Sequence, residues 1–442
     1  MKIQLSAHFT YQKLLRFTLP SIAMMILVSA YSIVDALFVS NYVGELAFSA
    51  VGVAAPVVYI ISSLGHLIGS GGSSVISRTL GEGKKEEASR YFTLLILVSI
   101  IMTTLLSALA IIFIEPLMRL AGASDLLLED CVKYGRILLA ALPLCVLQSV
   151  FSKFLVVLEK PTMGLLVSIA AGLANVVFDY LFIAVFGWGV EGAAYATAVG
   201  YIMGGGIPVL YVLLKKNLSL RFTGTKIYGK ILKQTASIGA SATLNSLSNT
   251  LIGILFNVQL MRLAGESAVA AYGVMLYSDF IFSGIFNGYS LGVSPTISYQ
   301  YGAGNKKELK NLFRRSCVLV VIFSVLSVLT SQLFAGGIAG LFVGKSPETM
   351  ALAVSGFRLF ALMYIFSGVS IFTSGFFAAL CKGKLSFVLS LLRSCVLKGG
   401  MVLLLPILLD VNGVWLSVAV ADAVTAVVSI VLLRKNKHMY CD

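Results

Sequence analysis

One stretch of the sequence occurs twice, and this duplication decides the fold. Residues 76–92 read ISRTLGEGKKEEASRYF, and residues 297–313, which begin 221 positions later, read ISYQYGAGNKKELKNLF. Seven of the seventeen aligned positions are identical, and the offset is half of the 442-residue chain. The same offset relates Gly44, Glu45, Ala47, Ala50, Gly52 and Val53 to Gly265, Glu266, Ala268, Ala271, Gly273 and Val274. Similarity at a fixed period indicates an internal repeat, so we predict two halves built on one plan.

The composition is that of a membrane protein. Hydrophobic residues make up 58% of the chain and charged residues 12%, and the mean hydropathy is +0.95. Apolar runs recur along the whole length, and a helix of about 20 apolar residues crosses the hydrocarbon core of a bilayer. An open sheet could not satisfy its backbone hydrogen bonds in lipid. We therefore predict an all-α polytopic membrane protein without a separate soluble domain.

The apolar runs predict twelve transmembrane helices, six in each half. They lie near residues 17–39, 47–75, 92–114, 134–157, 162–186, 191–214, 235–261, 268–296, 313–334, 351–380, 385–409 and 413–433. Because six spans return the chain to its starting side, both copies of the repeated stretch should face one compartment. We expect two pseudo-symmetric six-helix lobes. Residues 1–214 would form the amino-terminal lobe, 215–233 a cytoplasmic linker and 234–442 the carboxy-terminal lobe.

Lysine and arginine are concentrated in the loops on the side of the termini. These loops hold Lys84, Lys85, Arg90, Lys160, Lys215, Lys216, Arg221, Lys226, Lys230, Lys306, Lys307, Lys310, Arg314, Arg315, Lys382, Lys384, Arg434, Lys435 and Lys437. The opposite loops carry little beyond Arg119, Arg262 and Lys345. The positive-inside rule then places both termini in the cytoplasm, with the protein in the inner (plasma) membrane. The net charge of +14 then reflects basic residues that set the topology and contact anionic membrane lipid. Nucleic-acid binding is not expected.

The sequence contains no complete catalytic or metal-binding motif. The G-x-S-x-G match at residues 288–292 lies inside an apolar run instead of following a strand. His8, His66 and His438 are too few and too separated for a catalytic triad or a zinc-protease motif, and no P-loop is present for ATP. The six cysteines are scattered, which argues against a disulfide framework or a metal site. We expect a non-enzyme without a cofactor.

Polar residues within the first-half spans mark a candidate site. Asp35 lies in span one, Asn175 and Asp179 are four residues apart in span five, and Thr197 and Tyr201 are four residues apart in span six. An acid at the bilayer centre costs about 2.5–3.5 kcal/mol on insertion scales, so its presence indicates a function. Carboxylate, amide and hydroxyl oxygens are ligands for a small cation, whereas two close acids in a poorly solvated site could share a proton. The residues alone leave both interpretations open.

The second half has a different polar set. Asp279 lies in span eight, Arg393 and Lys398 in span eleven, and Asp422 in span twelve. Two acids and two bases near mid-membrane could neutralise one another as structural ion pairs or could contact a substrate. The sequence leaves these two roles open.

The organisation of the chain resembles a known transporter family. Twelve spans in two related halves, and a G-x-G loop followed by charged residues after spans two and eight (Gly81 and Gly83, Gly302 and Gly304), are similar to the multidrug and toxic compound extrusion (MATE) transporters. These belong to the multidrug/oligosaccharidyl-lipid/polysaccharide flippase superfamily. The resemblance covers the whole chain and implies a two-lobed fold of twelve transmembrane helices.

Four polar residues narrow the resemblance to one branch. Asp35, the Asn175-x-x-x-Asp179 pair and Thr197 resemble the cation site of DinF-like MATE transporters. The resemblance implies antiport, in which H⁺ or Na⁺ enters while an amphipathic, often cationic drug or toxic compound leaves. These four residues would couple the cation to export, and such efflux would confer antibiotic resistance.

A substrate cavity is expected to combine aromatic and polar side chains. The candidates are Tyr31, Phe38, Tyr201, Asn245, Asn249, Asp279, Asn287, Phe357 and Tyr364. An alternative function is a flippase for a lipid-linked sugar, which a basic cavity able to hold pyrophosphate would favour. A non-transporting receptor or enzyme is the alternative from another class, and the absence of catalytic motifs and soluble domains argues against it. We expect small-molecule substrates, membrane lipid as surroundings and a monomer.

Overall fold

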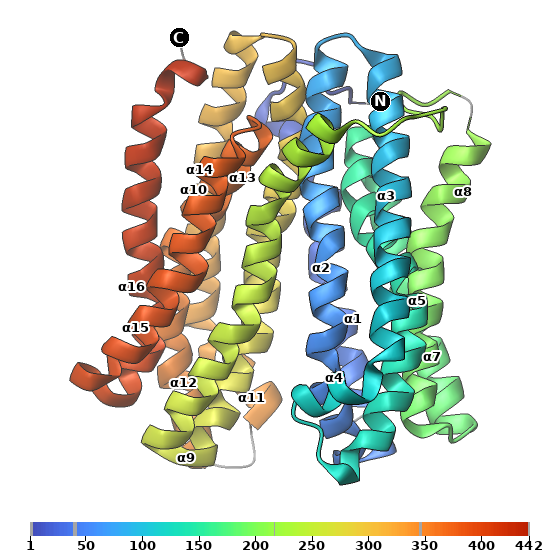
Figure 1. Cartoon of the computed structure of the whole chain (residues 1–442). Coiled ribbons are helices and arrows are strands. Elements are labelled where there is room, and N and C mark those ends of the chain that lie inside the picture. The colour runs from blue at the N-terminus through green and yellow to red at the C-terminus, as the bar shows by residue number, and fades with distance from the viewer. Residues whose placement is uncertain (1–2, 39–41, 216, 344–346, 441–442) are drawn as a thin grey trace. The chain divides into compact units, whose positions relative to one another are not determined.

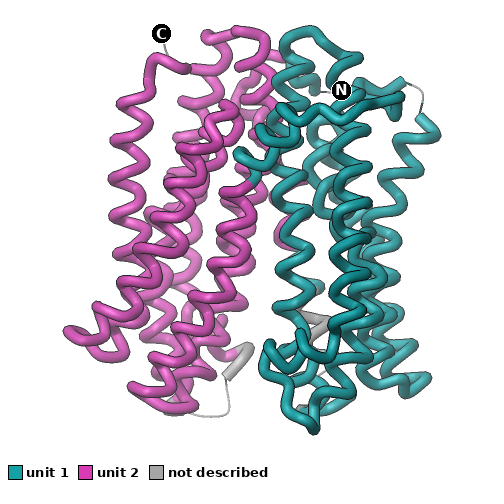
Figure 2. Tube along the Cα trace, in the orientation of Figure 1, with its two compact units in different colours: residues 1–6, 27–239 teal, residues 7–26, 240–442 magenta. Residues whose placement is uncertain are grey.

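The computed structural model describes residues 3–38, 42–215, 217–343 and 347–440, and every regular element within these ranges is a helix (Figure 1). The chain forms two compact units (Figure 2). Unit 1 comprises residues 1–6 and 27–239, and unit 2 comprises residues 7–26 and 240–442. The divisions at 26/27 and 239/240 fall inside α1 (Tyr11–Phe38) and α9 (Gly229–Gly302). The predicted lobe boundaries are at 214/215 and 233/234, and the second of these also falls inside α9. Each unit thus includes the beginning of a helix that continues in the other unit.

Prolines mark two of the helix starts in unit 1. Pro161 and Pro208 stand in the first turn of α6 and α8, where the missing N–H would have had no helical partner. The helices of unit 1 are α1 (Tyr11–Phe38, from residue 27 onward), α2 (Glu45–Gly81), α3 (Lys85–Ile112), α4 (Ile114–Leu120), α5 (Asp125–Val157), α6 (Pro161–Asp179), η2 (Tyr180–Val185), α7 (Gly189–Tyr201), η3 (Ile202–Gly206) and α8 (Ile207–Leu214).

Unit 2 contains the longest helix, α9, which is interrupted at Gly265 by non-helical dihedral angles (φ 66°, ψ −158°). In α16 a similar break occurs at Asp410 (φ 47°). The helices assigned to unit 2, with the beginning of α1, are α9 (Gly229–Gly302, from residue 240 onward), α10 (Lys306–Leu333), α11 (Ala335–Val343), α12 (Pro347–Phe360), η4 (Ala361–Met363), α13 (Tyr364–Ala379), α14 (Gly383–Leu391), η5 (Leu392–Leu397), α15 (Lys398–Leu404), α16 (Pro406–Lys435) and η6 (Lys437–Met439).

The predicted spans agree with the helices. Within the described residues, 11 helices are long and apolar enough to cross a membrane, and α9 is 74 residues long. Because α9 breaks at Gly265, it supplies the two predicted spans at 235–261 and 268–296. Every predicted span overlaps a helical segment, so the prediction of an all-α polytopic protein is confirmed.

The repeat is visible in the backbone as well as in the sequence. Gly44 (φ 109°) and Gly265 (φ 66°) both adopt left-handed dihedral angles, as do Gly83 (φ 80°) and Gly304 (φ 65°). Each pair is separated by 221 residues, as are the first residues of α4 and α11. Residues with a Cβ atom rarely adopt positive φ, which explains why glycine stands at these turns in both halves.

In unit 2 the repeated stretch fastens the chain segment that leads into α1. Asn305 caps α10, because its Oδ1 accepts a hydrogen bond from the Glu308 N–H (3.1 Å). The Glu308 carboxylate accepts the Phe9 N–H (2.9 Å) and lies 2.6 Å from His8 Nδ1. Asn311 Nδ2 donates to the Phe9 carbonyl (3.0 Å). Glu308 is therefore a buried anchor for the start of the chain.

The first copy of the stretch makes comparable contacts within unit 1. The Ser89 and Thr93 hydroxyls, at the start of α3, accept hydrogen bonds from the Arg221 N–H (3.4 Å) and the Thr223 N–H (3.1 Å). Residues 221–223 precede α9. In both halves the helix that follows the G-x-G loop thus holds the segment that leads toward the first helix of a repeat.

Each unit has its own hydrophobic core. The core of unit 1 includes small residues of α2, such as Ala50 and Ala54, packed with Leu139 and Leu142 of α5. The core of unit 2 contains larger side chains, among them the fully buried Trp415. The closely packed α2 and α5 support the cavity described next.

Candidate functional site

Unit 1 contains a cavity of about 250 Å³ that brings several predicted site residues together. Side chains from α1, α2, α5, α6 and α7 surround it. Its lining residues are Tyr31, Phe48, Val51, Ala55, Val58, Tyr59, Tyr134, Leu138, Gln148, Ala171, Asn175, Thr197, Gly200 and Tyr201. The cavity therefore combines four tyrosines with two amides and a threonine.

Asn175 and Thr197 supply polar atoms to this cavity. Asn175 is 4% exposed, and its Oδ1 atom has no hydrogen-bond partner among the described residues. The Thr197 Oγ1 atom is likewise buried and without such a partner within the described ranges. A buried polar oxygen that lacks a hydrogen bond costs about 1–3 kcal/mol. These two oxygens are therefore suited to bind a cation, a water molecule or a ligand donor.

Asp179 lies one helical turn after Asn175, as the i, i+4 spacing predicts. It is the last residue of α6 and is fully buried. The structure does not include it among the residues that line the cavity. Asp179 nevertheless lies on the same helix as Asn175. A buried acid is therefore only four residues away from the amide oxygen that lacks a partner among the described residues.

Two close helix contacts shape the cavity wall. A Cβ atom on Gly172 would lie 2.9 Å from the Tyr31 ring, and one on Gly204 would lie 2.4 Å from the Gln148 side chain. Both distances are shorter than Cβ atoms tolerate. Glycine at these positions therefore allows Tyr31 to pack against α6 and Gln148 to pack against η3.

The helices at the site change their hydrogen-bonding pattern beside the candidate residues. The π-helical segment η2 begins directly after Asp179, and η3 begins directly after Tyr201. In unit 2, η5 contains Arg393 and ends directly before Lys398. Short π-helical segments often occur at functional sites, and here each adjoins a polar residue that the sequence analysis selected.

The predicted cation-coupling set is described in part. Asn175 and Thr197 line one cavity, and Asp179 is buried on the same helix as Asn175. Asp35 lies in α1, but its side chain is outside the described part of the structure. Tyr31 and Tyr201, which were predicted to contact substrate, line the same cavity as Asn175 and Thr197.

Three predicted cavity residues lie elsewhere. Phe38 packs against the core of unit 1, and its ring stacks on Tyr42 with 5.5 Å between centroids. Asn249 and Asn287 of unit 2 are exposed, and Asn287 Nδ2 donates to the Ser283 carbonyl (2.9 Å). Substrate contact by these three residues stays a prediction.

Asn245 and Phe357 make structural contacts in unit 2, and their contact with substrate stays a prediction. Asn245 Nδ2 donates to Ser390 Oγ (3.3 Å), and its Oδ1 accepts from Ser394 Oγ (2.6 Å). Phe357 is fully buried in the core of unit 2. Asn245 is thus part of a structural hydrogen-bond network and Phe357 is a core residue, because the helix faces that carry them pack against other helices.

The charged residues of unit 2 are brought together. Arg393 Nε donates to Asp422 Oδ1 (3.0 Å), and Ser367 Oγ donates to Asp422 Oδ2. Lys398 interacts electrostatically with Asp422 and Asp279. The structural ion pair of Arg393 with Asp422 is therefore present, which supports the structural role over the role in substrate binding.

Asp279 and Tyr364 are also neighbours. Asp279 Oδ1 accepts a hydrogen bond from Ser283 Oγ (2.6 Å). The Tyr364 hydroxyl lies beside the Asp279 carboxylate, but it makes no hydrogen bond of standard geometry with a described residue. Tyr364 is fully buried in the core of unit 2, which differs from its predicted place on a cavity wall.

Three polar residues of the unit 1 cavity lie outside the set predicted from the sequence. Tyr59 lies on α2, and Tyr134 and Gln148 lie on α5. Gln148 could have been selected, because an amide within an apolar span needs a hydrogen-bond partner. The tyrosines carry no such signal, since aromatic residues are common throughout the spans.

Comparison with known proteins connects the chain to a family. A family model described as MatE matches residues 20–181 and 242–401. The Multidrug export protein MepA of Staphylococcus saprophyticus is 23% identical over 440 residues, which cover 96% of this chain and 93% of the relative. The FAD transporter of Shewanella oneidensis is 28% identical over 337 residues, which are 74% of each protein.

A solved structure confirms the fold. It is described as the outward-facing conformation of a multidrug resistance MATE family transporter of the MOP superfamily. It is 24% identical to this chain, covers 97% of it and 96% of its own chain, and superimposes with a TM-score of 0.92. The predicted fold class is therefore correct.

Proposed function

Because the chain belongs to the MatE family, the multidrug and toxic compound extrusion transporters, we propose that it exports amphipathic, often cationic compounds in exchange for H⁺ or Na⁺. It is a multi-pass membrane transporter and not an enzyme. One observation carries the proposal. Asn175 and Thr197 present oxygen atoms without partners among the described residues to a cavity that also holds Tyr31 and Tyr201.

The four tyrosines of the cavity support a cationic or amphipathic substrate. Aromatic faces attract cations by about 0.5–2 kcal/mol each, depending on desolvation, and their rings tolerate varied hydrocarbon shapes. The cavity volume of about 250 Å³ is slightly below the range of about 300–1,000 Å³ typical of ligand pockets. A small cation with part of a larger substrate would fill it.

The coupling site we propose is that of the DinF-like branch. It consists of Asp35, Asn175, Asp179 and Thr197, and Asp179 supplies a fully buried acid. Burial in a low-dielectric environment disfavours the charged form of a carboxylate, so it favours binding of a proton or a cation to it. A proton or Na⁺ can supply that charge in one state of the transporter, and a cationic substrate can supply it in the other. Because the coupling ion and the cationic substrate would compete to neutralise the same carboxylate, export of one would require uptake of the other.

Transport by acid-to-amide variants tests this coupling site. Asp35→Asn and Asp179→Asn should each abolish gradient-driven export of a cationic dye, while insertion and folding are retained. Glu115→Gln removes an exposed acid from α4 and serves as the matched control. Purified protein in vesicles would be assayed under an imposed Na⁺ gradient and then under an imposed pH gradient, which also identifies the ion. Unchanged export by either aspartate variant would exclude that residue from the coupling site.

The proposal places both termini in the cytoplasm of the cell that carries the transporter in its plasma membrane. Lys84 directly precedes α3 and Lys306 is the first residue of α10, so both lie at the ends of equivalent loops, and both are exposed. With the native cysteines replaced, a cysteine at either position should resist an impermeant thiol reagent in intact cells and react after the membrane is opened. Labelling in intact cells would show that these loops face outward and would contradict the proposed orientation. We also expect the protein to transport as a monomer, which crosslinking in the membrane can check.

The structure disfavours two anionic substrates. A flippase for a lipid-linked sugar must hold pyrophosphate, and the FAD transporter is named for a nucleotide that also contains it. Phosphate recognition commonly uses arginine or lysine, but neither is among the described residues that line the unit 1 cavity. Adding FAD to the vesicle assay provides a direct comparison with the dye.

A further inference from the structure

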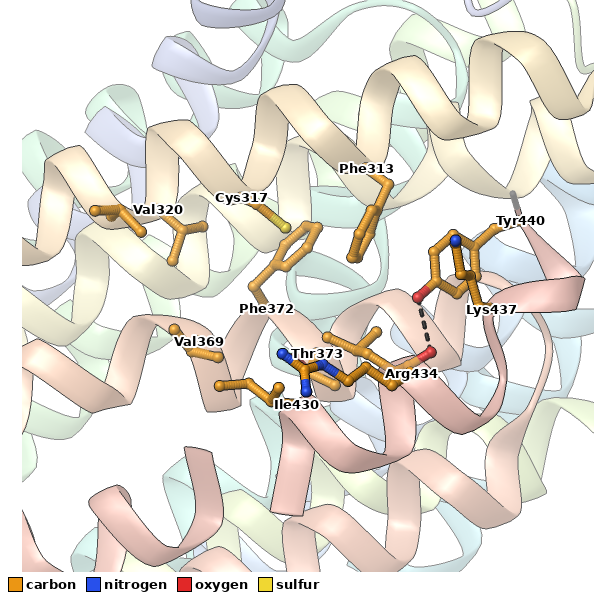
Figure 3. Close-up of a pocket in the computed structure, with 12 residues that line it drawn as sticks. Phe313, Cys317, Val320, Val369, Phe372, Thr373, Ile430, Arg434, Lys437 and Tyr440 are labelled. Carbon is orange, nitrogen blue, oxygen red and sulfur yellow. Dashed lines mark hydrogen bonds between the residues drawn. The ribbon is translucent and has the colours of Figure 1, made fainter. Parts of the chain in front are cut away.

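A second pocket lies in unit 2, between α10, α13 and α16 (Figure 3). Its volume is about 390 Å³. Cys317, Val320 and Val321 line it from α10, Phe372 from α13 and Ile430 from α16. Pockets in proteins commonly enclose about 300–1,000 Å³. This one has room for part of a hydrocarbon chain and none of its residues belongs to the proposed coupling site.

The pocket borders an apolar surface. Val321 is 54% exposed and Ile430 is 43% exposed, although both line the pocket. Val325 and Val427, the next residues along the same helix faces, are also exposed. Because α10 and α16 are membrane-spanning helices, an exposed apolar surface on them faces lipid chains. A lipid can therefore reach the pocket from the bilayer without crossing water.

The other end of the pocket is basic. Arg434 and Lys437 line it at the end of α16 and in η6. Figure 3 shows the Lys437 side chain beside Tyr440 and the Arg434 side chain extended toward Ile430. Both residues are exposed, and neither forms an ion pair within the described ranges. The described lining contains no acid. Since Arg434 lies in the last turn of a membrane-spanning helix, its long, flexible side chain can reach the depth of lipid headgroups.

One buried hydroxyl adds a second polar observation. Thr373 lines the pocket and is fully buried. Its Oγ1 atom has no hydrogen-bond partner among the described residues. A ligand with oxygen atoms could accept a hydrogen bond from this hydroxyl. A purely hydrocarbon ligand could not.

The corresponding cluster in unit 1 is covered by the chain itself. Phe92 and Phe151 precede Phe313 and Phe372 by 221 residues, and Phe222 covers Phe92 with 5.4 Å between ring centroids. In unit 2, Tyr440 contacts Phe313 at 4.6 Å, and the open pocket lies beside this pair. Both copies of the repeat therefore contain the aromatic cluster, and in unit 2 the pocket lies beside it.

From the apolar walls, the opening toward lipid and the basic end, we propose that this pocket binds an anionic phospholipid. One acyl chain lies between α10, α13 and α16, and the phosphate contacts Arg434 and Lys437. A basic residue near a membrane surface contributes about 1 kcal/mol to binding of anionic lipid. Two such residues should favour the anionic lipid over a zwitterionic one by about thirtyfold in affinity.

Native mass spectrometry of the purified full-length protein tests the proposal. The protein is given an equimolar mixture of phosphatidylglycerol and phosphatidylcholine, and retention of phosphatidylglycerol is expected. The double variant Arg434→Gln/Lys437→Gln should reduce that preference by about thirtyfold. Lys306→Gln/Lys307→Gln removes the same charge from exposed residues at the start of α10 and should retain the preference.

A second pair of variants tests entry of the acyl chain. Val321→Trp fills the mouth of the pocket from an exposed position, whereas Val325→Trp adds the same ring one turn further along α10, outside the pocket lining. Val321→Trp should lose the bound phosphatidylglycerol and Val325→Trp should keep it. Glycerophosphoglycerol, which has the headgroup without acyl chains, should not compete.

Three results would overturn the proposal. The first is equal retention of the two lipids by the unmodified protein. The second is an unchanged preference in the Arg434→Gln/Lys437→Gln variant. The third is competition by glycerophosphoglycerol, which would show a phosphate site without acyl-chain insertion. If Val321→Trp does not fold, the charge variants and the headgroup competition still decide the outcome.

Discussion

The buried ion pair in unit 2 allows a quantitative prediction. Asp422 has no exposed surface, while the Arg393 side chain is 13% exposed, and the two are 3.0 Å apart. Arg393→Met would leave the Asp422 carboxylate in the core with the Ser367 hydroxyl as its remaining hydrogen-bond donor within the described ranges. Removing one partner of a buried pair destabilises a protein by about 3–5 kcal/mol. Lys398, which also interacts with Asp422, should bring the loss toward the lower end of that range.

A double-mutant cycle separates the pair from its surroundings. Combining Arg393→Met with Asp422→Leu removes both charges, so the double variant should be more stable than the sum of the single losses predicts. We expect a coupling free energy of about 2–3 kcal/mol, in the upper part of the measured range for contacting residues. The free energy of unfolding would be measured by detergent titration in mixed micelles, with dye export as a check of the native state.

Asp410→Asn is the matched control for the loss of an acid from α16. Asp410 is exposed and adopts φ 47°, a conformation that asparagine tolerates. This variant should change stability by less than about 0.5 kcal/mol. If Arg393→Met were no more destabilising than Asp410→Asn, or if the two single losses were additive, the ion pair would not stabilise unit 2 and the reasoning would be wrong.

Two further predictions concern contacts within each unit. Glu308→Gln removes the charge of a buried carboxylate that holds the start of the chain; it should lower the free energy of unfolding by about 1–3 kcal/mol, and faster proteolysis of the first residues would report it. Gly239→Ala would place a Cβ atom 1.9 Å from the Leu67 carbonyl oxygen and should destabilise unit 1 by at least about 1–3 kcal/mol. Gly253→Ala, which meets nothing within 4 Å, should leave thermal stability unchanged or slightly raised, and equal loss in both glycine variants would contradict the packing argument.

The spans and the repeat could be predicted from the sequence because both depend on local composition. A run of apolar residues identifies a span whatever lies beside it, and the 221-residue offset identifies Gly265 as the counterpart of Gly44. The break inside α9 at Gly265 follows the same rule, since both glycines have positive φ. The π-helical segments η2, η3 and η5 carry no comparable compositional signal, because they depend on how neighbouring helices pack.

The candidate site could be predicted only in part, for a physical reason. The i, i+4 spacing puts Thr197 and Tyr201 on one face of their helix, and both line the unit 1 cavity. Spacing along one helix does not show which residues of another helix it meets. Gln148 was therefore missed, and Asn245 was assigned to a cavity although serines on neighbouring helices satisfy its amide.

The two halves share a backbone plan, but Asn245 and Asp422 of unit 2 are hydrogen-bonded differently from Asn175 and Thr197 of unit 1. In unit 2, the Asn245 amide donates one hydrogen bond and accepts another, and Asp422 accepts a hydrogen bond from Arg393. These groups therefore have partners without a ligand. In unit 1, oxygens of Asn175 and Thr197 face a cavity without partners among the described residues. A satisfied polar network favours one fixed arrangement, whereas unsatisfied buried oxygens gain free energy when a cation or donor arrives. This difference is the physical reason for assigning the proposed coupling site to unit 1 and a structural role to the charges of unit 2.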